Sequence, residues 1–311
     1  MTTRAWLIAG VAVLLVLLIL PVGLSSYHVS LATKMLILAV FAMSLDLLLG
    51  YAGLASLGHA AFFGVAAYAV GLLTLRAGFN PWFAFPIALM VAAVTGALYG
   101  LLALRARGTY FLMITLALAQ VLWGIAFGWR TMTGGDDGLP NVPRPQLGLP
   151  WSLGDTVPFY YFTVLVVGLA TVLLVCIVRS PFGYALRGIR ESESRMLALG
   201  YNAWRYKYIA FVLASVFAGL SGCMYAYYNR FVGIEYLHVV RSAEALLMVI
   251  LGGAGTLIGP ALGAALIVLL ENVISNYTQR WLLILGAIYV VVTLVAPRGL
   301  LGLVQQHWQK R

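Results

Sequence analysis

The chain has 311 residues, of which 63% are hydrophobic and only 9% are charged, and its mean hydropathy is +0.98. A soluble domain is about 45–50% apolar and about 25% charged, so this composition excludes a soluble protein, which could not hide so much apolar surface from water. The net charge is +10, but the basic residues lie mostly at the ends of apolar segments, so we also exclude a nucleic-acid-binding protein. We expect an all-α integral membrane protein in a lipid bilayer.

Apolar segments follow one another along the whole chain, and most approach the roughly 20 residues that a helix needs to cross a bilayer. We expect about nine or ten transmembrane helices in a single domain that covers residues 1–311. The first segment could also be a signal peptide, but its length and the absence of a small-x-small cleavage site favour a retained helix. The expected segments are residues 5–24, 32–50, 58–76, 82–104, 109–129, 158–179, 208–229, 242–252, 259–272 and 281–297.

Two glycine-rich stretches interrupt this apolar pattern. Leu-Gly-Tyr-Ala-Gly at residues 49–53 aligns with Leu-Gly-Gly-Ala-Gly at residues 251–255, either as an internal repeat or by chance. In transporters, paired interruptions at corresponding positions indicate the substrate path. Asp46 lies one turn before the first interruption, and a charge inside a membrane segment suggests a functional position, although a structural role is equally open. The predicted pathway residues are Asp46, Gly50, Gly53, Ser56, Gly58, His59, Gly252, Gly253, Gly255 and Gly259.

Two further acidic residues lie within or beside apolar segments. Glu244 follows Arg241 by three residues, a spacing at which the two side chains can pair on one helix face. Glu271 lies at the end of a segment, where we expect it to contact water. Lys34 lies near the start of another segment.

The sequence contains no recognisable catalytic or nucleotide-binding motif. No Gly-x-x-x-x-Gly-Lys-[Ser/Thr] loop occurs, so energy for any transport must come from a partner or from an ion gradient. Ser56 and His59 lie three residues apart, but Leu54 replaces the first glycine of the Gly-x-Ser-x-Gly nucleophile turn. No His-Glu-x-x-His pair occurs either. We expect no catalytic residue, no metal site and no cofactor bound by this chain.

The distribution of Lys and Arg predicts the orientation in the membrane. The loop at residues 179–207 carries six basic residues and is expected to be cytoplasmic. The loop at residues 130–157 carries three acidic and two basic residues and is expected to face outward. Ten crossings place both termini in the cytoplasm, provided that residues 242–272 form two helices and not one.

The cytoplasmic loop is expected to contain one amphipathic helix at about residues 183–200. Ser180 and Pro181 are typical of a helix start, Gly200 can end the helix and Asn202 can cap the next one. Such a helix either lies on the membrane surface or binds a soluble partner.

Several motifs in a fixed order show a resemblance to a known family. The cytoplasmic loop reads Gly-Tyr-Ala-Leu-Arg-Gly-Ile-Arg-Glu-Ser-Glu at residues 183–193 and Leu-Gly-Tyr-Asn at residues 199–202. With further motifs, these resemble the ABC permeases for branched-chain amino acids of the LivM type, over nearly the whole chain from about residue 35. The further motifs lie at residues 45–53, 56–62, 109–116, 218–222, 251–260 and 297–300.

The resemblance implies a permease subunit of an ATP-driven importer in the bacterial inner membrane, for branched-chain or other hydrophobic amino acids. Such a subunit forms the translocation pathway with a second, similar permease. Two cytoplasmic ATPases bind ATP and Mg, and a periplasmic binding protein delivers the substrate, so this chain is not itself an enzyme. Residues 187–200 would be the coupling helix that contacts the ATPases. The implied coupling residues are Arg187, Arg190, Glu191, Glu193 and Gly200.

The chain departs from the family pattern at Asp46, where Asn is common, and at Leu54, where Gln is common. Both positions lie near the expected pathway, so urea, amides and aromatic acids remain alternative substrates. Two other classes also remain open. One is a secondary transporter coupled to ions through Asp46 or Glu244, and the other is an intramembrane enzyme that uses Ser56 or His59.

Overall fold

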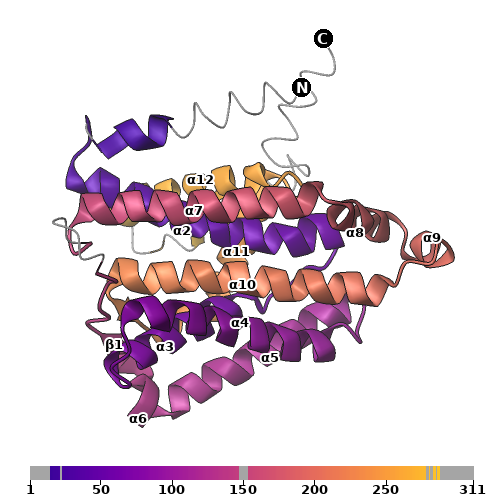
Figure 1. The fold of residues 1–311 in the computed structure, drawn as a ribbon, viewed down its shortest axis with the longest axis horizontal. Helices are drawn as coiled ribbons and strands as arrows, with labels where there is room; N and C mark the ends of the chain where they lie inside the picture. Colours follow the sequence, from indigo (N-terminus) through magenta and orange to yellow (C-terminus); the bar gives the residue numbers. More distant parts are fainter. Residues whose placement is uncertain are drawn as a thin grey trace.

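A computed structural model of the chain describes residues 15–21, 23–146, 153–277, 280, 283–284 and 286–287. These residues form a helical bundle with one two-stranded sheet (Figure 1), which confirms the all-α class. The long elements are α2 (Ser26–Asp46) with its π-helical continuation η1 (Leu47–Ala52), α3 (His59–Leu75), α4 (Pro81–Ala103), α5 (Thr109–Gly128), α7 (Thr156–Arg179), α10 (Ala203–Asn229), α11 (Val239–Gly252) and α12 (Ile258–Tyr277). The short elements are α6 (Arg130–Thr133), η2 (Gly135–Asp137), β1 (Leu139–Pro140), α8 (Pro181–Glu191), α9 (Glu193–Ala198), β2 (Phe231–Val232) and η3 (Ile234–Tyr236).

Six helices in the described part are long and apolar enough to cross a membrane, namely α2 with η1, α4, α5, α7, α10 and α12. Helix α3 is apolar but shorter, at 17 residues, and α11 has 14 residues and carries Arg241 and Glu244. The expected division of residues 242–272 into two helices is confirmed, since α11 ends at Gly252 and α12 begins at Ile258. The expected segments 5–24 and 281–297 lie largely outside the described residues.

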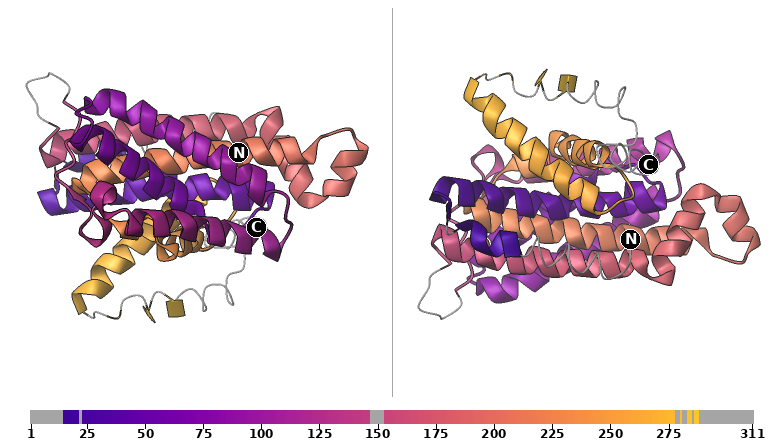
Figure 2. Two further views of the ribbon diagram at one scale, coloured as in Figure 1. Left: turned by 90° about the horizontal axis from the view of Figure 1, so that it is seen from below. Right: turned by 90° about the horizontal axis from the view of Figure 1, so that it is seen from above.

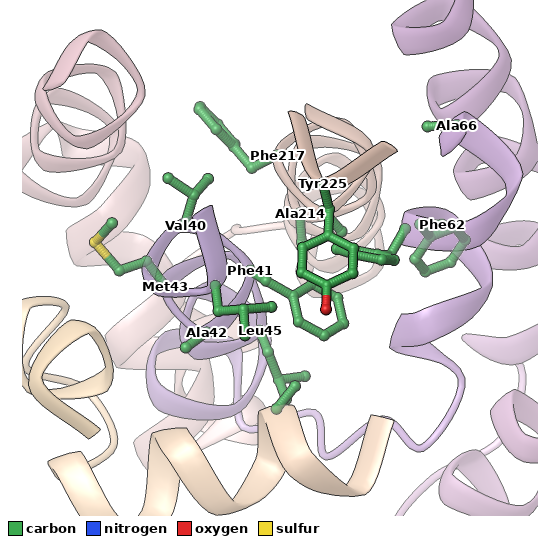
Figure 3. Close-up of a cluster of buried hydrophobic side chains, with 14 of the residues drawn as sticks. Val40, Phe41, Ala42, Met43, Leu45, Phe62, Ala66, Ala214, Phe217 and Tyr225 are labelled. Atoms are coloured by element: carbon green, nitrogen blue, oxygen red, sulfur yellow. The ribbon is translucent and has the colours of Figure 1, made fainter. Parts of the chain in front are cut away.

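Helix α10 lies at the centre of the bundle and packs against α2, α3 and α4. Aromatic and small side chains fill the space between α2, α3 and α10, among them Phe41, Phe62, Ala66 and Ala214 (Figure 3). The buried residues of α4 are all Ala or Gly. Small residues let helix backbones approach closely, which replaces the hydrophobic driving force that is missing in lipid.

Gly222 on α10 shows how close this packing is. A Cβ at Gly222 would overlap the backbone carbonyl of Phe63 on α3, whereas a Cβ at Gly124 on α5 would meet nothing within 4 Å. We expect Gly222→Ala to destabilise the protein by about 1–3 kcal/mol, because the contact is with backbone that cannot rotate away. Thermal unfolding in detergent measures this. Gly124→Ala is the matched control, and equal melting temperatures for the two variants would contradict the packing described here.

The two polar loops lie at opposite ends of the bundle (Figure 1). At one end, β1 in the loop expected to face outward pairs antiparallel with β2 after α10. Arg144 fixes this loop by donating hydrogen bonds to the carbonyl oxygens of Tyr227 at 2.8 Å and Leu153 at 3.0 Å. Burial lowers the pKa of Arg144 to about 10, a value that leaves the guanidinium charged at neutral pH.

At the other end, α8 and α9 project beyond the bundle (Figure 1), and the prediction of one helix over residues 183–200 is wrong. Ser192 has an extended backbone, with φ −158° and ψ 98°, which divides the segment into α8 and α9. Its hydroxyl accepts a hydrogen bond from the Arg195 amide at 3.4 Å, so Ser192 caps a new helix and does not continue the old one. The predicted limits are confirmed: Pro181 is at the first position of α8, Gly200 has φ +85°, and Asn202 caps α10.

Candidate coupling and translocation site

The first glycine stretch begins where α2 passes into the π-helical turn η1. A π-helical turn is rare and is frequently found at functional positions. Gly53 ends the turn with φ +72°, a conformation that glycine adopts without strain. Gly50 is buried, and a Cβ there would overlap both the Asp46 carboxylate and the backbone of Gly255. Glycine at residue 50 is therefore required for the close approach of the second glycine stretch.

The second glycine stretch is the turn between α11 and α12. Gly253, Gly255 and Leu257 all have positive φ, at +105°, +84° and +61°. The turn folds back tightly, since a Cβ at Gly252 would overlap the carbonyl of Gly259. The Gly253 N–H still donates to the Val249 carbonyl oxygen of α11, whereas the N–H groups of Gly255 and Leu257 donate to a side chain of another helix.

Asp46 joins the two glycine stretches. Its side chain is fully buried, and its carboxylate oxygens accept hydrogen bonds from the backbone N–H of Gly255 at 2.7 Å and of Leu257 at 3.0 Å. The positive charges of Arg187 and Arg190 lie close enough to act on this carboxylate. We call this set of contacts the Asp46 clamp. It gives Asp46 a structural function in holding the two stretches together.

Helix α8 packs directly on the first glycine stretch. The Arg190 guanidinium donates a hydrogen bond to the carbonyl oxygen of Gly50, and the Arg187 guanidinium lies 4.7 Å from the ring centroid of Tyr51. Two of the predicted coupling residues therefore point inward to η1. Through η1 and Asp46, α8 is mechanically linked to the 253–257 turn.

Helix α9 is the exposed part of the predicted coupling segment. It buries no side chain, and Leu197 is 52% exposed. Glu193 ties α9 back to the bundle through Lys207 at 2.8 Å and Arg107 at 3.7 Å. The hydrogen bond from Lys207 holds the pKa of Glu193 below its usual value, so the carboxylate stays charged at neutral pH. Glu191, at the end of α8, is exposed.

The hydrogen bonds of Ser56 and His59 go to other residues and not to each other. His59 is fully buried, and its Nε2 lies 2.7 Å from the Ser44 hydroxyl, while its ring stacks on Phe41. The Ser56 hydroxyl accepts a hydrogen bond from the Gly58 backbone at 3.2 Å. A nucleophile needs its base within hydrogen-bond reach, and here the histidine is engaged by another residue. This arrangement disfavours the enzyme alternative.

Both acidic residues of the last two helices form ion pairs. Glu244 and Arg241 pair at 2.7 Å, as their spacing predicts. Glu271 was expected to contact water, and its side chain is 26% exposed, while its carboxylate also pairs with Lys34 at 2.9 Å. The partners lie 237 residues apart, so no local pattern in the sequence could have indicated this pair.

Comparison with known proteins places the chain in a family. Residues 27–294 match the family described as branched-chain amino acid transport system permease component. The chain is 30% identical to the high-affinity branched-chain amino acid transport system permease protein LivM of Escherichia coli, over 94% of this chain and 74% of LivM. It is 26% identical to the guanosine ABC transporter permease protein NupQ of Bacillus subtilis, over 60% of each chain. Solved structures give no significant match. The chain belongs to the branched-chain amino acid ABC transporter permease family.

Proposed function

We propose that this chain forms, with a second related permease, the translocation pathway of an importer for branched-chain or other hydrophobic amino acids in a bacterial inner membrane. The similarity of this chain to LivM supports this substrate class. The chain is also 28% identical to LivH of Escherichia coli over 43% of its length, which supports a pair of similar permeases. ATP and Mg are used by two partner ATPases, and a periplasmic binding protein delivers the substrate.

In this proposal, the end of the bundle that carries α8 and α9 faces the cytoplasm. Its loop is the one rich in Lys and Arg, and such loops stay on the cytoplasmic side. The loop held by Arg144 then faces the periplasm, where a binding protein would dock. This orientation places the Asp46 clamp and both glycine stretches at the inner end of the pathway.

The observation that carries the proposal is the connection from α8 to the two glycine stretches. Exposed α9 and the end of α8 would receive the movement of the ATPases. Arg187 and Arg190 would transmit it to η1, and Asp46 would transmit it onward to the 253–257 turn. Tightly packed elements move between discrete arrangements, so a small displacement can switch the inner end between closed and open. The predicted pathway residues would then act as an inner gate.

Charge reversal at Glu193 tests the coupling segment. We expect Glu193→Lys to detach α9 from α10, because a third cation would replace the carboxylate between Lys207 and Arg107. If the free energy of binding to the ATPases falls by about 1–2 kcal/mol, roughly five- to thirtyfold less ATPase should remain in the purified complex. Copurification in mild detergent measures the ATPases and the second permease together.

Glu193→Gln is the control for this experiment, since its amide oxygen can still accept a hydrogen bond from Lys207. The second permease should remain bound in both variants, because α8 and α9 are only one end of the bundle. Wild-type amounts of ATPase with Glu193→Lys would overturn the assignment of α9 to coupling.

A further inference from the structure

Four charged side chains from three helices form a cluster away from the coupling end. Lys34 on α2 contacts both carboxylate oxygens of Glu271 on α12, at 3.0 and 2.9 Å. Arg241 and Glu244 on α11 pair at 2.7 Å. The two pairs also act on each other, since Glu244 lies within electrostatic range of Lys34 and Glu271. We call these four residues the charge network.

The charge network lies toward the end of the bundle opposite α8 and α9. Lys34 precedes Asp46 by twelve residues, which is about 18 Å along the axis of a helix. Helix α12 runs obliquely across the bundle (Figure 2), from the 253–257 turn toward that opposite end, and carries Glu271 with it. The four side chains are between 12% and 26% exposed, so they are reachable from outside the chain.

A purely structural role explains this cluster poorly. Charges inside a membrane-spanning bundle are costly, and well-packed apolar residues commonly replace a buried ion pair without loss of stability. Elsewhere in the bundle, α4 carries no charged residue and packs on α10 through buried Ala and Gly and one hydrogen bond, from the Tyr227 hydroxyl to the Pro81 carbonyl oxygen. The charge network is also neutral overall, with two cations and two anions, so it can exchange partners without leaving a net charge.

We propose that the charge network is a subsite for the ammonium and carboxylate groups of a zwitterionic amino acid as it passes through the outer half of the membrane. This rests on the proposed function as an amino acid importer. Lys34 and Arg241 would face the carboxylate, and Glu244 and Glu271 would face the ammonium group. An apolar path would strip water from both ends of the substrate with no compensation, whereas this cluster offers a counter-charge to each.

Replacing one ion pair by apolar residues separates this role from a structural one. We expect the double variant Lys34→Met with Glu271→Met to copurify with its partners at wild-type stoichiometry. Uptake of radiolabelled L-leucine into proteoliposomes containing the whole complex should fall at least about tenfold, which corresponds to about 1.4 kcal/mol. A network that only joins α2 to α12 would tolerate this change.

Exchanging the charges is the second arm of the experiment. Lys34→Glu with Glu271→Lys restores an ion pair between the two helices. It exchanges the positions of the positive and the negative charge that the substrate would contact. We expect normal assembly and low uptake. Wild-type uptake by either double variant would overturn the subsite while leaving the proposed function intact. A wild-type complex that takes up no amino acid would instead overturn the proposed function.

Discussion

Asp46→Leu is expected to abolish transport and to destabilise the protein by roughly 3–6 kcal/mol, because two backbone N–H groups, one buried and one partly buried, each lose a hydrogen bond to a charged acceptor. The groups concerned are the backbone amides of Gly255 and Leu257. Thermal unfolding of the purified chain and uptake by the reconstituted complex measure the two effects. Both follow from one cause, the opening of the Asp46 clamp.

Asp46→Asn is the matched variant for this prediction. The amide keeps one acceptor oxygen at nearly the same position. In the family that the chain resembles, Asn is the common residue at this position. We expect at least half of wild-type uptake and a small loss of stability. If Asp46 instead carried a coupling ion or proton, Asp46→Asn would abolish uptake as completely as Asp46→Leu, and the Asp46 clamp would not be its main function.

Arg190→Met is expected to uncouple ATP hydrolysis from transport. The variant loses the hydrogen bond from α8 to the Gly50 carbonyl but leaves exposed α9 unchanged. The ATPases should therefore still bind and hydrolyse ATP, while uptake per ATP falls at least about tenfold, as one lost charge-assisted bond of 1.5–3 kcal/mol implies. Parallel assays of phosphate release and uptake in proteoliposomes give the ratio.

Arg195→Met on α9 is the control for Arg190→Met. Arg195 carries the same charge in the same segment, but its side chain is exposed. We expect Arg195→Met to keep the wild-type ratio of uptake to hydrolysis. An unchanged ratio in Arg190→Met would show that α8 does not act on the pathway through Gly50.

Features that depend on neighbouring residues could be predicted from the sequence. The apolar segments, the start of α8 at Pro181 and the pairing of Arg241 with Glu244 each follow from local spacing or local preference. The alignment of the two glycine stretches predicted a shared place on a substrate path, but it did not predict the contact that the structure shows between Gly50 and Gly255.

Features that join distant parts of the chain could not be predicted in this way. The Asp46 carboxylate binds backbone amides 209 and 211 residues away, and Lys34 binds Glu271. The sequence does not show which backbone N–H groups bind a side chain, because every residue other than proline has such a group. The division of the coupling segment at Ser192 was missed for another reason, since the apolar spacing continues through it while the capping hydroxyl ends the helix locally.

The most direct test of the linkage from α8 to the 253–257 turn is the rate at which a cysteine in that turn reacts. Ala254 is exposed in the turn, and Cys176 is the exposed native cysteine in the described residues. In a Cys176→Ser background, Ala254→Cys would be labelled with a membrane-impermeant maleimide in the nucleotide-free complex and in the complex trapped with ATP and vanadate. We predict a severalfold difference in rate between the two states, and no difference when Arg190→Met is added. Equal rates in the two states, or a difference that survives Arg190→Met, would contradict the linkage.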